Sequence, residues 1–390
     1  MEEKFIPLSV PNLKGNELKY VTHAVESEWV STAGPYVTDF EKCVAAYVHT
    51  LGAVACQSGT AGLHIALQLC GVRREDLVLV PTLTFIAAVN PVKYAGADPV
   101  FMDCDDSLCM DPAKLRSFCE EACEMRGDSL YHKATGRRIP ALVIVHIFGN
   151  MADMETILSI GKAFHLKIVE DATEAIGTKY TIGPLAGKYA GTMGDVGVFS
   201  FNGNKIITTG GGGMIVSQQE ELLHEAKHLT TQAKADEANF IHDEIGYNYR
   251  LTNLQAALGL AQMEQLEDFI AIKERNYRLY RELLQDVKGL SILPFRAGIR
   301  SNYWFYSLTC EKPFPLQRSQ LIEKLKKDRI QTRPIWGLIH EQKPYLGSLT
   351  WQIEKAEYYW NRVVNLPCST SLTEEDVNRV VNCIKNYEKC

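Results

Sequence analysis

Apolar residues in the first half of the chain alternate between two spacings, which predicts strands followed by helices. Short apolar runs of strand length recur, and a stretch with helical spacing follows most of them. The strands predicted in this way are 52–56, 77–80, 99–103, 141–146, 166–169 and 196–201. Because repeated strand–helix units build a mostly parallel sheet covered by helices, the pattern predicts an α/β fold.

The pattern changes after Ser217, which indicates a second part of the chain. A long amphipathic pattern from residue 253 to about 287 can link two domains. Beyond it, strand-like and helical segments alternate less regularly up to a final helix at 374–387. We therefore predict a large domain at 1–252 and a small domain at 253–390, within the range expected for this length. The polar segment 126–138 is interpreted as an exposed loop.

Composition excludes several classes of protein. The net charge of −6 gives no electrostatic footprint for nucleic acid. No segment approaches the ~18 apolar residues that a membrane span needs, and the acidic start of the chain is unlike a signal peptide. The eleven cysteines are scattered without paired CxxC spacing, which favours reduced, buried thiols over a metal site. These features predict a cytoplasmic protein without a bound metal.

The stretch 194–217 holds one lysine between two apolar runs. Lys205 follows the run 196–201 and is the only ionisable residue from Val196 to Ser217. Four glycines, Gly210 to Gly213, then lead into the second run. An amine held among apolar groups can act as a nucleophile in Schiff-base chemistry. This stretch alone is equally compatible with a solvated lysine in a flexible loop.

A turn of small residues, 57–62, separates the first predicted strand from a helix. Free backbone N–H groups and the positive end of the helix dipole coincide there, which makes an anion site. The turn matches neither a Walker A sequence nor GxGxxG. Taken alone, a plain helix N-cap by Ser58 or Thr60 explains it better.

Several reactive or aromatic side chains lie at or just beyond the ends of predicted strands, namely Thr84, Phe85, His146, Asp171 and the stretch 200–205. Ligands collect at the carboxyl ends of strands in such sheets, so we expect these side chains near one site. One ligand uses an amine, an anion site, a carboxylate and an aromatic ring together. That ligand is pyridoxal phosphate, with an aldehyde, a phosphate, a ring nitrogen and a flat ring.

The motifs resemble the DegT/DnrJ/EryC1/StrS family of nucleotide-sugar aminotransferases, which are fold-type I pyridoxal-phosphate enzymes. The resemblance covers about residues 6 to 270 and rests on PNLKGNELKYV, SGTAGLHIAL, VPTLTFIAAVN, VEDATEAIG, GDVGVFSFNGNK and GYNYRLTNLQAALGLAQ. It implies a large domain with a mostly parallel seven-stranded sheet and a smaller C-terminal α+β domain. It also implies that pyridoxal 5'-phosphate is the cofactor.

The resemblance assigns roles around the cofactor ring. Lys205 is the catalytic residue and forms the Schiff base, Asp171 pairs with the ring nitrogen, and Phe85 stacks on the ring. Glu174 is also counted as cofactor-binding, although the family usually has Gln or His there. A carboxylate at that position can alter the electronics of the ring. The family also usually has a glutamate within the glycine run, which this chain lacks.

Further residues are implied for the phosphate, the partner and the substrate. The backbone of Gly59 and Thr60 and the Ser200 hydroxyl hold the phosphate. Asn248 reaches the cofactor phosphate of a second subunit, so a homodimer with shared active sites is expected. The residues expected to contact substrate are Trp29, Ser31, Arg333 and His340.

The reaction implied is transfer of an amino group from glutamate to a keto nucleotide-sugar, for cell-surface polysaccharide. The segments NGNKIITTGGGGMI and TRPIW resemble the subgroup that aminates C4 of 4-keto-6-deoxy-N-acetylhexosamine nucleotides, as in legionaminic-acid-type pathways. C3 amination, dehydration and a non-catalytic regulator are the alternatives. Dehydratase relatives carry histidine at the position of Lys205, and this favours transamination.

Overall fold

The computed structural model describes residues 4–388 and is built on one sheet. The sheet has eight strands in the order β1-β11-β10-β8-β7-β2-β3-β18. Their bounds are β1 Gly52–Cys56, β11 Gly213–Ser217, β10 Val196–Ser200, β8 Lys167–Asp171, β7 Ala141–Val145, β2 Leu77–Pro81, β3 Asp98–Met102 and β18 Leu349–Trp351. Only β11 runs against both of its neighbours. The mostly parallel α/β fold is therefore confirmed, and β18 adds an eighth strand to the seven expected.

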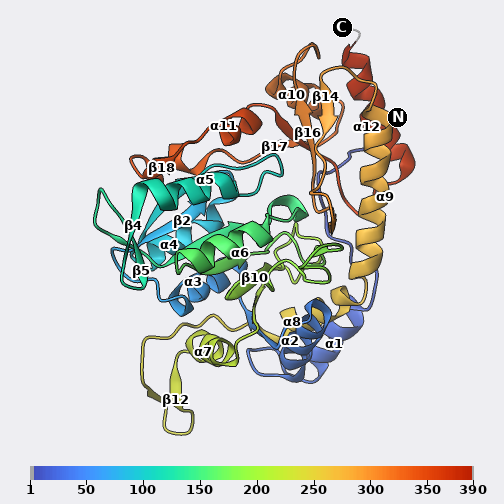
Figure 1. Cartoon of the computed structure of the whole chain (residues 1–390). Helices are drawn as coiled ribbons and strands as arrows, with labels where there is room; N and C mark the ends of the chain where they lie inside the picture. The colour runs from blue at the N-terminus through green and yellow to red at the C-terminus, as the bar shows by residue number, and fades with distance from the viewer. Residues whose placement is uncertain (1–3, 389–390) are drawn as a thin grey trace.

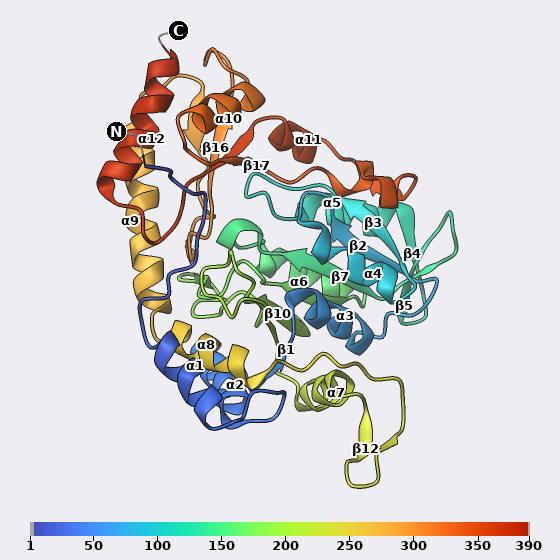
Figure 2. The same ribbon diagram turned by 180° about the vertical axis from the view of Figure 1, so that it is seen from behind.

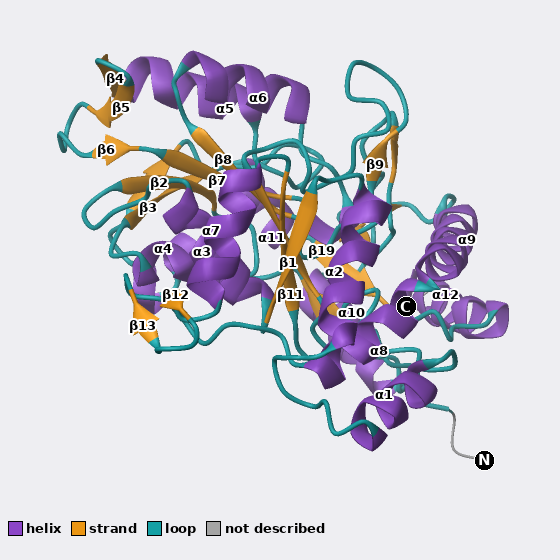
Figure 3. Cartoon of the chain, turned by 90° about the horizontal axis from the view of Figure 1, so that it is seen from below, coloured by secondary structure: helices purple, strands orange, loops and turns teal. Residues whose placement is uncertain are grey.

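Helices cover both faces of this sheet, as Figure 3 shows. One face carries α3 (Gly59–Leu69), α4 (Asn90–Tyr94) and α7 (Glu220–Thr230), and the other carries α5 (Pro112–Ser117) and α6 (Met154–Ala163). Because both faces are covered, the inner strands β2, β7, β10 and β11 are buried at every position. This explains why these strands read as continuous apolar runs rather than as alternating patterns.

Two N-terminal helices and the start of the amphipathic stretch form a separate layer. Helices α1 (Glu17–Glu26) and α2 (Pro35–Val48) both pack on α8 (Asn253–Met263). The amphipathic stretch is two helices, because the chain breaks after α8 and continues as α9 (Leu266–Leu284). Helix α9 runs along one side of the molecule towards α12, Glu374–Glu388 (Figure 1). Within residues 4–388, none of the helices has the length and apolar character needed to cross a bilayer.

The C-terminal part carries its own antiparallel sheet, in the order β14-β16-β19-β17. The strands are β14 Leu290–Ile292, β16 Tyr306–Cys310, β19 Val363–Leu366 and β17 Arg333–Pro334, and the helices are α10 Arg318–Lys327 and α11 Lys355–Trp360, with α12. The N-terminal chain also reaches this part, since Ile6 forms a bridge with Ile330. The boundary predicted at residue 252 stays a prediction.

The expectation of an exposed loop at 126–138 is wrong. The segment belongs to a small antiparallel sheet of β4 (Cys123–Arg126), β5 (Ser129–His132) and β6 (Arg138–Ile139). Gly127, with a φ of +59°, allows the tight turn between β4 and β5. Leu130 and Ile139 are each 1% exposed, so alternate positions face the core although most of the segment is polar. Helix α5 ends at Ser117, and a short π-helix, η2 (Phe118–Ala122), leads into β4.

Two short pairs of strands lie outside these sheets. β9 (Lys179–Tyr180) pairs with β15 (Ile299–Arg300), and β12 (Lys234–Asp236) pairs with β13 (Ile241–His242). Figures 1 and 2 both show the β12 hairpin projecting beyond α7, away from the main body. This hairpin is the most isolated element among the described residues.

A buried carboxylate fastens the C-terminal part to the edge of the large sheet. Asp103, directly after β3, is 0% exposed and accepts hydrogen bonds from the backbone N–H groups of residues 354, 355 and 356 at 2.8–3.1 Å. Lys114 Nζ donates to the same carboxylate at 2.7 Å. Burial opposes ionisation of Asp103, but these donors outweigh it and lower its pKa. The C-terminal part is therefore attached to β3 twice, by the pairing of β18 with β3 and by the hydrogen bonds of Asp103 to residues 354–356.

Candidate active site

A cavity of about 300 Å³ opens at the carboxyl ends of the parallel strands. It is lined by seven of the residues predicted for the cofactor, namely Gly59, Thr60, Phe85, Asp171, Glu174, Ser200 and Lys205. Asp171 and Ser200 are the last residues of β8 and β10, and Phe85 follows β2. The sheet topology therefore brings together side chains that are far apart in sequence, as the strand-end argument predicts.

One wall of the cavity is the first turn of α3. The Ser58 side chain caps the helix by accepting from Ala61 N at 3.1 Å. A helix of this kind leaves the first N–H groups, those of Gly59 and Thr60, without carbonyl partners in the helix. A Cβ at Gly59 would lie 2.9 Å from the Cβ of Ser200, so glycine leaves space where the helix meets β10. The N-cap and the anion cradle thus coexist, and their donors fit a phosphate group.

Lys205 lies in the turn that follows β10. Its side chain is 13% exposed, and its Nζ lies 3.5 Å from Glu174 Oε1. The chain then returns to β11 through the glycine run, where Gly210 adopts a φ of +77°. Gly211 and Gly212 line the cavity. The glycines therefore serve both as a turn and as part of the wall of the cavity.

Two buried carboxylates lie beside this lysine. Asp171 is 3% exposed and accepts from Thr173 N at 3.0 Å, and its burial raises its pKa. Glu174 accepts from Phe148 N at 2.7 Å. Burial raises the pKa of Glu174 to about 7, with the Lys205 charge acting in the opposite direction. Glu174 can therefore hold or release a proton near neutral pH.

Aromatic rings make the remaining walls. Phe85 is 51% exposed, and the centroid of its ring lies 5.9 Å from that of Trp336. The Trp336 ring also contacts that of Phe148, with centroids 4.8 Å apart. Trp304 lies deeper and is 1% exposed. An accessible ring face such as that of Phe85 suits stacking of a flat, conjugated ligand. The cavity thus holds an amine, two carboxylates, an anion cradle and a stacking surface.

The sequence matches the DegT/DnrJ/EryC1/StrS aminotransferase family over residues 11–385. The chain belongs to this family. GDP-perosamine synthase of Escherichia coli O157:H7 is 36% identical over 98% of this chain and 99% of its own length. UDP-4-amino-4-deoxy-L-arabinose–oxoglutarate aminotransferase of Shewanella sediminis is 28% identical over 98% of each chain. This protein is accordingly a pyridoxal-phosphate-dependent sugar aminotransferase.

Solved structures give the same result for the fold. A DegT/DnrJ/EryC1/StrS aminotransferase from Brucella abortus superposes with a TM-score of 0.87 at 27% identity, covering 96% of both chains. The fold-type I architecture is therefore confirmed. In the present protein, the groups around the cavity also fit pyridoxal phosphate. They supply an amine for the aldehyde, N–H groups for the phosphate and a carboxylate for the ring nitrogen.

The residues predicted to contact substrate do not line the cavity of this aminotransferase. The backbone oxygens of Trp29 and Ser31 accept hydrogen bonds from Asn253, at 2.7 and 2.6 Å. Arg333 is exposed on β17. His340 Nδ1 lies 2.6 Å from the hydroxyl of Thr82, just after β2. Their substrate contacts stay predictions.

Sequence reasoning missed two tryptophans and misjudged one histidine. Trp304 and Trp336 line the cavity. Trp304 lies shortly before β16, and nothing in the sequence connects it with Lys205. His146 was expected at the site, and it is instead fully buried with Nε2 2.8 Å from Glu170. Glu170 in turn accepts from the backbone of Met193 at 2.6 Å. This buried pair fixes the loop before β10 and does not line the cavity.

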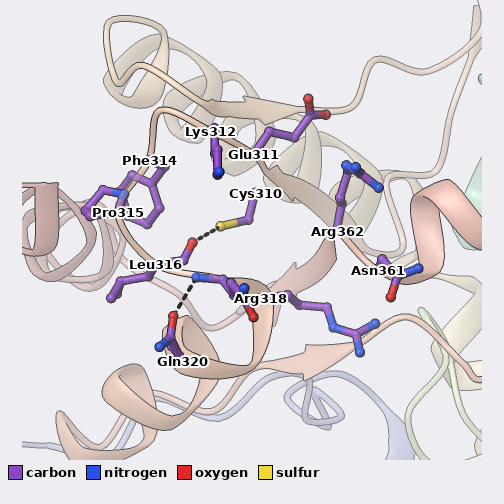
Figure 4. A pocket seen from close by; sticks show the side chains of 11 residues that line it. Cys310, Glu311, Lys312, Phe314, Pro315, Leu316, Arg318, Gln320, Asn361 and Arg362 are labelled. Carbon is purple, nitrogen blue, oxygen red and sulfur yellow. Dashed lines mark hydrogen bonds between the residues drawn. The ribbon is translucent and has the colours of Figure 1, made fainter.

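Two clusters in the described part of the chain have side chains that can ligate a metal, His228–Asp243–Glu244 and His340–Glu341–Glu357. Both are half-exposed, and no member lines the cavity. A larger groove of about 840 Å³ lies on the C-terminal part (Figure 4). It is bounded by the 310–320 loop, Asn361 and Arg362. Neither the two clusters nor the groove supplies the groups that the cofactor needs.

Proposed function

We propose that this aminotransferase moves an amino group from glutamate to C4 of a nucleotide-linked 4-keto-6-deoxy-N-acetylhexosamine, in cytoplasmic synthesis of cell-surface polysaccharide. The observation that carries the proposal is Lys205 Nζ beside Glu174 in a cavity with a phosphate cradle. The names of the two relatives support a nucleotide sugar, a 4-amino product and the oxoglutarate–glutamate pair. The segments around Lys205 and Trp336 support the N-acetylhexosamine subgroup through their resemblance.

Lys205 has two tasks in this proposal. When bound, the cofactor supplies an aldehyde that carries the amino group and a ring that stabilises negative charge on the neighbouring carbon. Lys205 anchors the cofactor through Nζ. Once free, the same amine would take the proton from the amino-bearing carbon of the donor as a base and give it back as an acid.

The two carboxylates differ in their tasks. Asp171, anchored by Thr173 N at the end of β8, would hold the proton on the ring nitrogen of the bound cofactor. Glu174, anchored by Phe148 N, lies next to Lys205 and balances the charge of its ammonium form. The N–H groups of Gly59 and Thr60, with the Ser200 hydroxyl, bind the phosphate. Phe85 and Trp336, which line the cavity, would stack on the ring and limit the access of water.

We further propose a homodimer in which Asn248 completes the partner's site. Asn248 is exposed, lies outside the cavity and pairs with Thr231 at the base of the projecting hairpin. Exposed apolar side chains surround this hairpin, with Phe240 74%, Ile241 55% and Ile245 84% exposed. Such a patch is usual where a second chain covers it. Trp29, Ser31, Arg333 and His340 then contact substrate in the completed site.

The decisive experiment is a panel of 4-keto and 3-keto nucleotide sugars, each incubated with the holoenzyme and glutamate. We expect the mass of an amino sugar from the 4-keto N-acetylhexosamine nucleotides and from no 3-keto sugar. The visible absorbance of the cofactor should be bleached by glutamate alone. Amination of 3-keto sugars only would contradict the C4 assignment. Loss of the hydroxyl without gain of nitrogen would indicate dehydration instead.

A further inference from the structure

The amine of Lys205 is in contact with an aromatic face as well as with a carboxylate. Its Nζ lies 4.1 Å from the centroid of the Trp304 ring, and Glu174 Oε1 lies 3.5 Å from the same atom. An ammonium over an indole is attracted by the negative face of the ring, and tryptophan is the best of the aromatic side chains in this respect. Water is largely excluded here, since the Lys205 side chain is 13% exposed, and this strengthens the attraction.

The Trp304 ring is held in place independently of the lysine. Its indole N–H donates to the carbonyl oxygen of Asn204 at 2.8 Å, which ties the ring to the residue before Lys205. Its backbone N–H donates to Asn302 Oδ1 at 3.0 Å, and its ring stacks on Phe305 with centroids 4.1 Å apart and planes 12° apart. With 1% exposure, the ring has little freedom to turn. It is therefore a fixed surface onto which the lysine can dock.

We propose that Trp304 is a positioning residue that docks the free ammonium of Lys205 and so stabilises the form of the enzyme in which the lysine is not bound to the cofactor. The inference rests on the proposed anchoring role of Lys205. That lysine must alternate between a covalent and a free form, and only the free form carries the full charge that Trp304 attracts. In the free form, Glu174 and Trp304 hold Nζ from two directions. The ammonium then delivers its proton from a defined position.

A direct test replaces Trp304 with tryptophans carrying one, two or three fluorine atoms, introduced at this site only. Fluorine withdraws electron density from the ring while its shape and the indole hydrogen bond are largely kept. The free ammonium then loses stabilisation. We therefore expect the affinity of the apoprotein for pyridoxal phosphate, measured by visible absorbance at fixed pH, to increase with each fluorine. The expected total is about tenfold, within the range of a desolvated cation–aromatic contact.

The amino-transfer equilibrium should shift in the opposite sense. With each fluorine, a higher ratio of glutamate to 2-oxoglutarate should be needed to bleach half of the visible absorbance, because release of the lysine becomes less favourable. A matched control is the same series at Trp351, whose indole N–H donates to Ser117 at 3.0 Å and which does not line the cavity. Both measurements should stay unchanged in that series.

The direction in which fluorination changes cofactor affinity shows whether Trp304 attracts the ammonium or only fills space. If Trp304 only fills space, fluorination should leave cofactor affinity unchanged or weaken it, and either result would overturn the inference. The proposed function has a separate check, reduction of the holoenzyme with borohydride followed by peptide mass. If Lys205 carries the reduced cofactor but the affinity for pyridoxal phosphate does not change with fluorination, only the role of Trp304 is refuted. An unmodified Lys205 refutes the anchoring role itself.

Discussion

The groove on the C-terminal part of this enzyme and the cavity at the strand ends differ in size and in what surrounds them. The groove on the C-terminal part has about 840 Å³, and the cavity at the strand ends has about 300 Å³. In the groove, polar groups form hydrogen bonds with residues close to them in sequence. Cys310 Sγ donates to Leu316 O at 2.9 Å, and Gln317 N donates to Gln320 at 2.8 Å (Figure 4). In the cavity, Asp171, Glu174 and Lys205 converge while largely removed from water.

The difference shows that convergence of buried ionisable groups, and not volume, marks the active site. Burying a carboxylate or an ammonium costs free energy unless a partner compensates it. A fold that keeps three such groups within one cavity does so against stability, which is typical of functional sites. The groove carries no comparable cost. Changes in the cavity should therefore affect catalysis and the pH dependence of stability, whereas changes in the groove should affect neither.

The largest effect is expected for Lys205→Ala. Without the amine, the enzyme loses both the cofactor anchor and the group that moves the proton, so kcat/KM for the keto sugar should fall by more than about 10³-fold. The visible absorbance of bound cofactor should also disappear. Lys205→Arg is the matched control, because it keeps a positive charge beside Glu174 but cannot form the covalent link. Substantial turnover by either variant would sink the assignment of this cavity.

An intermediate effect is expected for Glu174→Gln, in the pH dependence of stability. Burial raises the pKa of Glu174 from 4.5 to about 7, so the folded protein binds this proton more tightly than the unfolded chain. Its stabilising contribution is complete below pH 4.5 and is lost as the pH rises through about 7. Relative to the glutamine variant, the wild type should lose on the order of 3 kcal/mol over this interval.

The measurement is denaturant unfolding of the apoprotein at a series of pH values between these limits. Gln keeps the size of Glu, so no cavity or overpacking is introduced. Two stability curves that run parallel across the whole pH interval would show that Glu174 is not held in an environment that favours its neutral form. The pH dependence of stability would then no longer distinguish the cavity from the groove.

The smallest effect is expected for Arg362→Ala in the groove. Arg362 lies over the ring of Tyr358 at 4.0 Å and donates to the Tyr358 carbonyl at 3.0 Å, both near the surface. Its removal should change the free energy of unfolding by less than about 1 kcal/mol. The KM for the nucleotide sugar should stay within about twofold, within the scatter of surface changes. A several-fold rise in KM would instead place an anionic part of the substrate in the groove.

Much of the site follows from the sequence because its residues sit at fixed places in regular elements. Asp171 and Ser200 end strands, and Gly59 begins a helix, so the strand–helix pattern is enough to bring them to one edge. Lys205 was recognisable because its surroundings in sequence contain no other charge. For these residues, local pattern and long-range topology agree.

The remainder depends on contacts that no local pattern encodes. Trp304 meets Lys205 from almost 100 residues away, and its position depends on how the C-terminal part packs. The sheet of β4 to β6 was missed because its strands are short and mostly polar, with few apolar positions such as Leu130 and Ile139 on the covered face. His146 shows the converse error, since a strand end does not reveal whether a side chain faces the cavity or the core.

The attachment of Asp103 limits how this enzyme can open. Residues 354–356 are bonded to a carboxylate of the large sheet, and β18 is paired with β3 beside them. A swing of the whole C-terminal part about a single hinge would break both connections. Trp336 follows β17 directly in the chain, and its ring contacts those of Phe85 and Phe148 on the large sheet. Access to the cavity therefore depends on side chains at its rim, such as the half-exposed Phe85, rather than on closure between two rigid bodies.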